Sequence, residues 1–93
     1  MKIKILIPIY NDWQSAAKLI NKIDNLVKEI NHEFSLVIVN DGSSEIKPDR
    51  FGFSENLHSV QILNIKMNIG HARCIATGLK HIYQNEEFDY IIP

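Results

Sequence analysis

The chain has 93 residues, 45% of them hydrophobic, and a formal net charge of −1 at pH 7. That length predicts one domain, and that apolar share is enough for a core, which excludes a disordered tail. The ten Lys and Arg residues are spread along the chain. The composition therefore excludes the basic stripe of a dedicated nucleic-acid binder, and we expect no nucleic-acid partner.

Cysteine content and hydropathy predict a cytoplasmic protein. Cys74 is the single cysteine, so no intramolecular disulfide can form, which fits a reducing compartment. The N-terminal run MKIKILIPIY lacks the cleavage site of a signal peptide. No stretch approaches the roughly 20 apolar residues that a membrane helix needs.

A strand and a helix are predicted first. Residues 2–9 are almost continuously apolar and rich in β-branched side chains, which is typical of a strand covered on both faces. Pro8 should lie at the C-terminal end of this strand, where it costs no ladder bond. Asn11 is expected to cap the helix, with Gln14 three positions on as in a capping box. The helix should end near residue 31 or 32, and its apolar residues recur at helical spacing: Trp13, Ala16, Ala17, Ile20, Ile23, Val27 and Ile30.

The second half of the chain predicts two more strands around a second helix. Residues 34–39 form a buried strand that Asp-Gly-Ser-Ser ends, and residues 45–57 form a loop that could contain a short helix. Residues 59–65 form the third strand, and residues 88–92 begin the fourth. The helix between them begins at residue 70 or 71, and we expect its apolar face to contain Ala72, Ile75, Ala76, Leu79, Ile82 and Tyr83.

This alternation of strands and helices predicts an α/β fold, Rossmann-like, with three α/β/α layers and a mostly parallel sheet. Such sheets bind ligands at the carboxyl ends of their strands, where the strand order reverses. Polar and turn-forming residues gather at the ends of three of the predicted strands, and the fold should bring them to one edge of the sheet. They are Pro8, Tyr10, Asn11 and Asp12; Asn40, Asp41, Gly42, Ser43 and Ser44; and Asn68, Gly70, His71 and Arg73. This convergence predicts a binding site.

Each of these residues also has a simpler interpretation. Asp41 could accept hydrogen bonds from a nucleobase or a ribose, or it could form a turn with Gly42. Tyr10 could stack on a base, or close the edge of the core. A helix beginning at residue 70 favours anions, and Arg73 could meet a diphosphate, but a plain helix start explains the same sequence. His71 could act as a base or phosphate contact, or simply cap the helix.

Several other site classes lack their motifs. The chain has no Walker loop, no G-x-G-x-x-G turn and no G-x-S-x-G elbow. No Cys and His residues have the spacing of a zinc site. We therefore predict neither a catalytic residue nor a metal ligand within the chain.

Four segments together resemble one enzyme family. ILIPIYND, LVIVNDGSS, NIGHARCIATGL and FDYIIP occur in this order. They resemble the N-terminal, nucleotide-sugar-binding half of a family-2-type glycosyltransferase with the GT-A fold. The resemblance spans residues 2–93, with a vague middle at residues 45–57. It implies that the chain is an incomplete part of a domain that transfers a sugar from a nucleoside diphosphate sugar to an acceptor.

The resemblance also implies roles for matched positions. Pro8 and Tyr10 would flank the nucleobase, with Asp12 near it. Asn40 and Asp41 match an acidic pair that contacts base and ribose, although Asn40 replaces the usual first aspartate. Asn68 and Gly70 match the turn before the next helix. His71 and Arg73 match a subgroup that resembles polyprenyl-phosphate sugar transferases and related membrane-associated enzymes.

The resemblance sets expectations for cofactor, partners and location. The Asp-x-Asp motif that holds a divalent cation, Mg or Mn, would follow directly after Pro93, so we expect no cofactor within these residues and no transfer by them alone. The acceptor, which would be a polyprenyl phosphate or a glycan, stays open, as do the sugar and the base. The full-length protein could lie at the cytoplasmic face of a membrane. Self-association through the sheet edge that is left open after Pro93 is also expected.

Two alternatives remain open from the sequence. The chain could be a catalytically inactive, truncated module that binds a nucleotide or a protein. It could also be an unrelated doubly wound domain such as a receiver-like module, for which Asp12 and Asp41 offer a partial acidic cluster.

Overall fold

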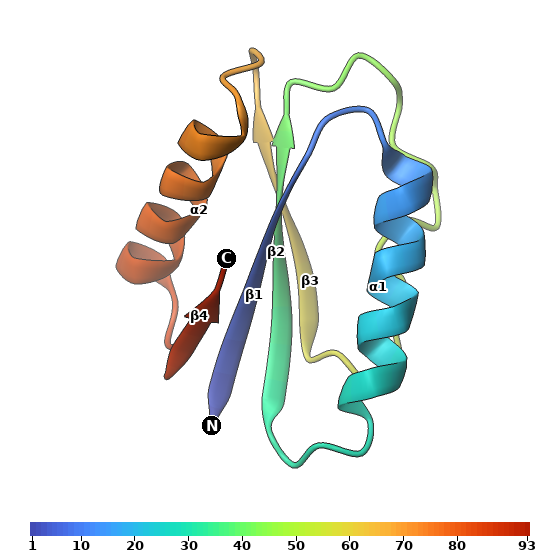
Figure 1. Ribbon diagram of the computed structural model, residues 1–93, viewed down its shortest axis with the longest axis vertical. Helices are drawn as coiled ribbons and strands as arrows, with labels where there is room; N and C mark the ends of the chain where they lie inside the picture. The colour runs from blue at the N-terminus through green and yellow to red at the C-terminus, as the bar shows by residue number, and fades with distance from the viewer.

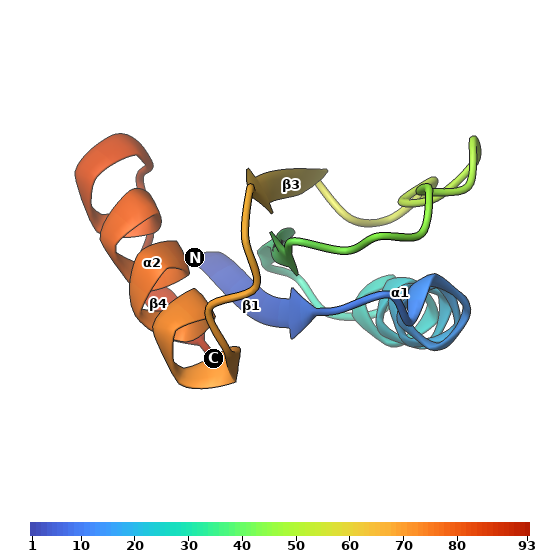
Figure 2. The same ribbon diagram turned by 90° about the horizontal axis from the view of Figure 1, so that it is seen from above.

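The computed structural model describes residues 1–93 as an α/β protein with a four-stranded parallel sheet and two helices. The elements are β1 (Lys2–Ile9), α1 (Trp13–Val27), β2 (Glu33–Asp41), β3 (Ser59–Ile65), α2 (His71–Asn85) and β4 (Tyr90–Ile92). The two helices lie on opposite sides of the sheet, which gives three layers (Figures 1 and 2). The predicted fold class is confirmed. Neither helix has the length and apolar character needed to cross a membrane.

The strand order is β3-β2-β1-β4. The chain moves outward from β1 to β2 and β3, and α2 then carries it back across to β4 on the other side of β1 (Figure 1). The order therefore reverses between β1 and β4. The classic dinucleotide-binding order begins in this way, whereas receiver-like folds place β3 next to β1. The topology argues against the receiver-like alternative.

The central strand β2 separates two apolar cores. Phe34, Leu36 and Ile38 point to the α1 side, where Trp13 and Ile20 complete the packing. The alternate side chains of β2 point to the α2 side, with Leu6, Val37, Val39, Cys74 and Ile82 forming that core. Burial of each such aliphatic side chain contributes about 1.5–3 kcal/mol. The apolar run of β2 is therefore explained by coverage on both faces, as the sequence predicted.

The predicted start of α1 is wrong by one residue. Asp12 is the N-cap, and its Oδ1 accepts a hydrogen bond from the backbone N–H of Ser15 at 3.3 Å. Asn11 instead adopts a positive φ of 60°, and its side chain binds the loop after β2. The helix also ends earlier than predicted, at Val27, and Ile30 is exposed in the turn that follows.

The predicted apolar face of α2 is only partly correct. Cys74, Gly78 and Ile82 face the sheet, while Ala72, Ala76 and Tyr83 are exposed. A Cβ added at Gly78 would overlap the side chain of Leu6. The glycine therefore lets the helix lie close to the sheet, and the row of α2 residues in contact with the sheet is Cys74, Gly78 and Ile82.

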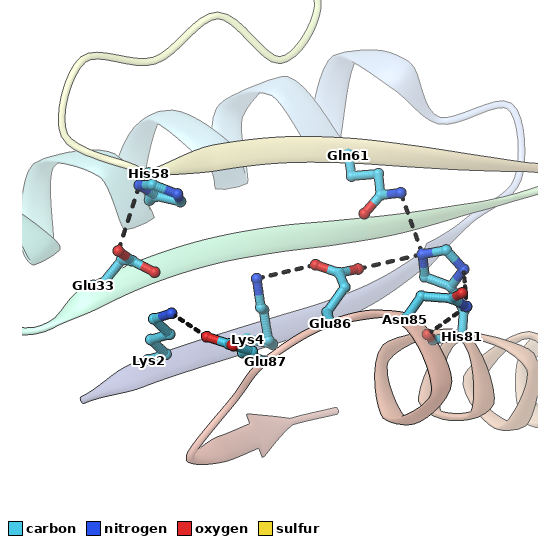
Figure 3. A network of polar contacts seen from close by, with 9 residues as sticks. All are labelled: Lys2, Lys4, Glu33, His58, Gln61, His81, Asn85, Glu86 and Glu87. Atoms are coloured by element: carbon cyan, nitrogen blue, oxygen red, sulfur yellow. Dashed lines mark hydrogen bonds and ion pairs between the residues drawn. The ribbon is translucent and has the colours of Figure 1, made fainter.

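A charged network fastens the C-terminal end of α2 to the sheet (Figure 3). Lys4 of β1 is buried, and its Nζ lies 3.0 Å from Oε1 of Glu86. The other carboxylate oxygen of Glu86 lies 3.2 Å from Nε2 of His81, which is also 3.2 Å from the amide nitrogen of Gln61. A buried charge is tolerated only when it is paired, so Glu86 is what allows Lys4 to lie under α2.

The segment between β2 and β3 is a loop, as predicted, and it does not contain the short helix that the sequence allowed. Asp24 of α1 holds its last part, because the carboxylate accepts backbone hydrogen bonds from Glu55, Asn56 and Leu57 at 2.8–3.2 Å. Burial alone would raise the pKa of Asp24, but these bonds outweigh burial and lower it. Leu57 is thereby held in the core on the α1 side.

Candidate functional site

A cavity of about 430 Å³ opens at the carboxyl end of β1, where the strand order reverses. The end of β1, the first turns of α1 and the N-terminus of α2 form its walls. Its lining is Ile7, Pro8, Ile9, Tyr10, Asp12, Ser15, Ala16, Leu19 and His71. The structure thus brings together four of the residues that the sequence proposed, namely Pro8, Tyr10, Asp12 and His71.

The four residues offer different chemistry to this cavity. Tyr10 and Asp12 are exposed, so the phenol ring and the carboxylate remain open to a ligand. Pro8, near the C-terminal end of the strand β1, contributes an apolar wall. His71 is the first residue of α2 and brings an imidazole beside the helix N-terminus. An apolar floor with a few convergent polar groups is the usual composition of a small-molecule site.

Asp41 lies outside this cavity and is 1% exposed. Its Oδ1 accepts a hydrogen bond from the backbone N–H of Ile69 at 2.7 Å, and its Oδ2 accepts one from that of Gly70 at 3.0 Å. The bond from Ile69 is the main reason why the pKa of Asp41 is lowered, and burial opposes it. Both oxygens are therefore engaged in holding the loop that leads into α2.

Cys74 lies beneath this carboxylate and is fully buried. Burial, together with the neighbouring carboxylate of Asp41, raises the pKa of its thiol to about 11. The thiol is therefore protonated at neutral pH and acts as a small core residue.

The Asp-Gly turn after β2 packs directly against the loop after β3. Asn68 donates from its side-chain amide to the carbonyl of Asp41 at 3.3 Å. Gly42 has a φ of +67°, and a Cβ there would lie 2.7 Å from the backbone nitrogen of Asn68. The turn interpretation of this segment is therefore correct for Gly42, which permits the close approach of two loops.

Sequence reasoning missed the function of Ser43 and Ser44. The Ser43 hydroxyl accepts from the backbone N–H of Asn11 at 2.8 Å, and the Ser44 hydroxyl accepts from the Asn11 amide at 3.1 Å. Asn11 in turn accepts from the backbone N–H of Glu45 at 2.9 Å. These bonds clamp the loop that contains Tyr10 to the loop after β2. One signal in the sequence could have indicated this role. Asparagine tolerates a positive φ and is common in turns, so Asn11 could have been predicted to lie in a turn before the helix.

The other proposed residues are not in the cavity. Asn40 donates to the side-chain oxygen of Asn64 at 3.0 Å and accepts from the backbone N–H of Ser43 at 3.3 Å. Gly70 is the N-cap of α2, with a φ of +90°. Arg73 is exposed in the first turn of α2, outside the cavity lining.

A second, larger hollow of about 750 Å³ lies at the amino end of the sheet. It is open and lined mainly by polar residues, among them Lys2 and Glu87, which form an exposed ion pair at 2.7 Å. None of the residues proposed from the sequence lines it. The cavity at the carboxyl end of β1 is therefore the better candidate.

The residues of this chain do not fit a divalent cation. No three His, Cys, Asp or Glu side chains come close enough together to hold one. The cation that the glycosyltransferase resemblance implies would need ligands other than these.

No protein-family model matches the chain. No solved structure matches it at a significant level. The fold and the cavity thus define an α/β protein of Rossmann-like topology, and its assignment to the glycosyltransferases stays a prediction.

Proposed function

We propose that this chain binds the nucleotide part of a nucleoside diphosphate sugar, as the donor-binding portion of a glycosyltransferase. The observation that carries the proposal is the position of the 430 Å³ cavity. It lies at the carboxyl end of β1, beside the point where the strand order reverses. Open parallel α/β sheets bind their ligands at such a point.

The base would lie between Pro8 and Tyr10. Both line the cavity, and Tyr10 as a residue is 46% exposed, so a ligand can cover it. Stacking of a base on an aromatic ring is worth about 1–3 kcal/mol. Asp12 would accept a hydrogen bond from the base or the ribose, since its second carboxylate oxygen has no partner in the chain.

The diphosphate would lie toward α2. The first N–H groups of a helix have no partner within the helix and favour anions. The buried carboxylate of Asp41 already takes the N–H groups of Ile69 and Gly70. We therefore assign the diphosphate to the side chains of His71 and Arg73, in the first turn of α2. Asn40 and Asp41 act on the ligand through the loops that they hold.

The alternative function is a nucleotide- or protein-binding module without catalysis. It would use the same cavity, because nothing in the proposed nucleotide site depends on a transfer step. The two functions differ only in whether a sugar donor is preferred over a free nucleoside diphosphate.

The test is a titration of the ¹⁵N-labelled chain with UDP, GDP, CDP and dTDP, followed by the corresponding sugar conjugates, in NMR spectra. We expect one diphosphate to shift the amide signals of Tyr10, Asp12 and His71. Tyr10→Ala should weaken its binding roughly tenfold, as loss of a base stack predicts. The matched control is Tyr83→Ala, because Tyr83 is exposed on α2 and lies outside the cavity.

Two results would overturn the proposal. One is the absence of any saturable shift with all four diphosphates. The other is binding that Tyr83→Ala weakens as much as Tyr10→Ala does. A diphosphate that binds while its sugar conjugates bind no tighter would favour the module without catalysis.

A further inference from the structure

The strand β3 is an unprotected edge of the sheet. It is the outermost strand on its side, and its sequence, SVQILNI, contains no charged residue and no proline (Figure 2). Its residues 59–65 form a regular parallel ladder with β2 on the inner side. None of the hydrogen bonds of the loops and side chains involves the backbone of these seven residues. The outer side of β3 therefore has free N–H and C=O groups along its length.

The other edge of the sheet is much shorter. The strand β4 has three residues, Tyr90–Ile92, and thus offers less than half the length of β3. Natural proteins protect long edges with charges, prolines or bulges, and β3 has none of these. The lack of these protecting features makes β3 an edge that is suited to pairing.

Exposed apolar side chains flank this edge. Met67, two positions after β3, is 75% exposed, and Phe53 of the preceding loop is 67% exposed. The loop that contains Phe53 lies against β3, because a Cβ added at Gly52 would be 3.3 Å from the side chain of Val60. Met67 therefore offers apolar contact at the end of this edge, whereas Phe53 lies on the α1 side, where it lines a hollow with Asn21 and Asp24.

The charges at the two ends of β3 are complementary when the strand meets itself in the antiparallel direction. His58 precedes β3 and pairs with Glu33, Nδ1 to Oε1 at 3.6 Å (Figure 3). Lys66 follows β3, and its side chain makes no ion pair within the chain. His58 and Lys66 are each four positions from Ile62, so antiparallel pairing centred on Ile62 puts Lys66 of the second copy opposite His58, one strand away from Glu33 of β2.

We propose that two copies of this chain associate through β3, antiparallel and centred on Ile62, to form one continuous eight-stranded sheet with twofold symmetry. Each strand contributes seven residues, or about 23 Å of edge at roughly 3.3 Å per residue. The same surface on both copies is used, as a twofold interface requires. This association is independent of the nucleotide site, which lies at the end of β1.

The first test is the mass of the chain in solution, by size-exclusion chromatography with light scattering over a wide range of concentration. We expect a mass twice the 10.7 kDa of the chain. Ser59→Lys should weaken the dimer at least tenfold, because it puts a charge opposite Ile65 and next to Lys66 of the second copy. Ser59 is exposed and its side chain makes no hydrogen bond, so the variant should fold, as circular dichroism would check. The matched control is Ile92→Lys, which adds the same charge to the β4 edge and should leave the dimer unchanged.

A second measurement tests the register. Cys74 is buried, so a cysteine at Ser59→Cys can be spin-labelled selectively. In the proposed dimer the two labelled positions are six residues apart along the strands, or about 20 Å at roughly 3.4 Å per residue. A dipolar distance near that value supports the register. A chain that is monomeric at all concentrations, a mass that grows beyond two copies, a dimer lost only in Ile92→Lys, or a clearly longer distance would each overturn the proposal.

Discussion

The carboxylate of Asp41 binds the backbone N–H of Gly70, with 3.0 Å between Oδ2 and that nitrogen, although 29 positions separate the two residues. This bond joins the end of the central strand β2 to the first residue of the α2 cap. It fixes where α2 begins, and therefore where His71 lies in the cavity at the end of β1. A buried carboxylate outside the cavity thus positions a group inside it.

The first prediction concerns Asp41→Asn. The amide keeps the shape of the carboxylate, but its NH₂ group would face the N–H of Ile69 or Gly70, so one donor would lose its acceptor. We expect the thermal midpoint to fall by roughly 5–10 °C. Nucleotide binding, where it is detected, should weaken through displacement of His71. Calorimetry and the titration described above measure the two effects.

Asp49→Asn is the matched control for that experiment. Asp49 is an exposed carboxylate in the loop after β2, and its side chain makes no hydrogen bond. The same change of charge there should leave the midpoint and the binding nearly unchanged. An equal effect of the two substitutions would mean that net charge, and not the loop contact, is responsible.

The second prediction is the pH dependence of this contact. The pKa of Asp41 is lower in the folded chain than its ordinary value near 4. A lowered pKa means that the unfolded state binds the proton more tightly, so the contribution to stability is complete above about pH 5 and is lost as the pH falls through the folded pKa. The difference in unfolding free energy between wild type and Asp41→Asn should therefore shrink between about pH 5 and pH 2. Urea unfolding across that range measures it, and a difference independent of pH would contradict the assignment.

The third prediction concerns the buried pair of Lys4 and Glu86. Glu86→Gln removes the charge that compensates Lys4 under α2, and we expect a loss of about 3 kcal/mol in unfolding free energy. The double substitution Lys4→Met with Glu86→Gln should recover most of the loss, because no uncompensated charge then remains buried. The exposed pair of Lys2 and Glu87 is the control, and Glu87→Gln should change stability little. If the double variant is no more stable than Glu86→Gln, the uncompensated charge of Lys4 is not the cause of the loss in unfolding free energy.

The fourth prediction concerns Asp24, which holds the loop before β3. Asp24→Ala leaves the backbone N–H groups of Glu55, Asn56 and Leu57 without their acceptor. We expect a loss of about 1 kcal/mol, at the low end for charged hydrogen bonds because the site is partly exposed. Amide hydrogen exchange should become faster in residues 55–57 and stay unchanged in β2. Unchanged exchange in those three residues would contradict a clamping role.

The sequence predicted the elements well because their signals are local. The continuous apolar run of β2 and the helical spacing of α1 need no knowledge of distant contacts. The carboxyl-edge site could be predicted in part for the same reason, since parallel strands must end at one edge. Pro8 lies near the end of β1, Tyr10 and Asp12 come directly after it, and all three line the cavity.

The errors came from contacts between distant segments. Asn11 has the composition of a helix cap, but Ser43 and Ser44 engage it, and Asp12 takes the cap instead. Gly78 looks like a weak point in a helix, yet it is where α2 comes closest to Leu6. Such partners lie tens of positions away, so no local pattern could reveal them.

The fifth prediction compares Gly42, in the turn after β2, with Gly70, at the end of the loop that this turn packs against. Gly42 and Gly70 both have positive φ, at 67° and 90°, so alanine at either position strains the backbone, by about 1–3 kcal/mol. Only at Gly42 would the added Cβ meet neighbours, the backbone atoms of Met67 and Asn68, whereas Gly70 has open space. Gly42→Ala should therefore destabilise the chain more than Gly70→Ala, and the excess measures the packing of the turn after β2 against the loop after β3. Equal losses of unfolding free energy in the two variants, measured by chemical denaturation, would mean that the two loops separate easily. In that case Asp41 could not hold His71 in position through these loops.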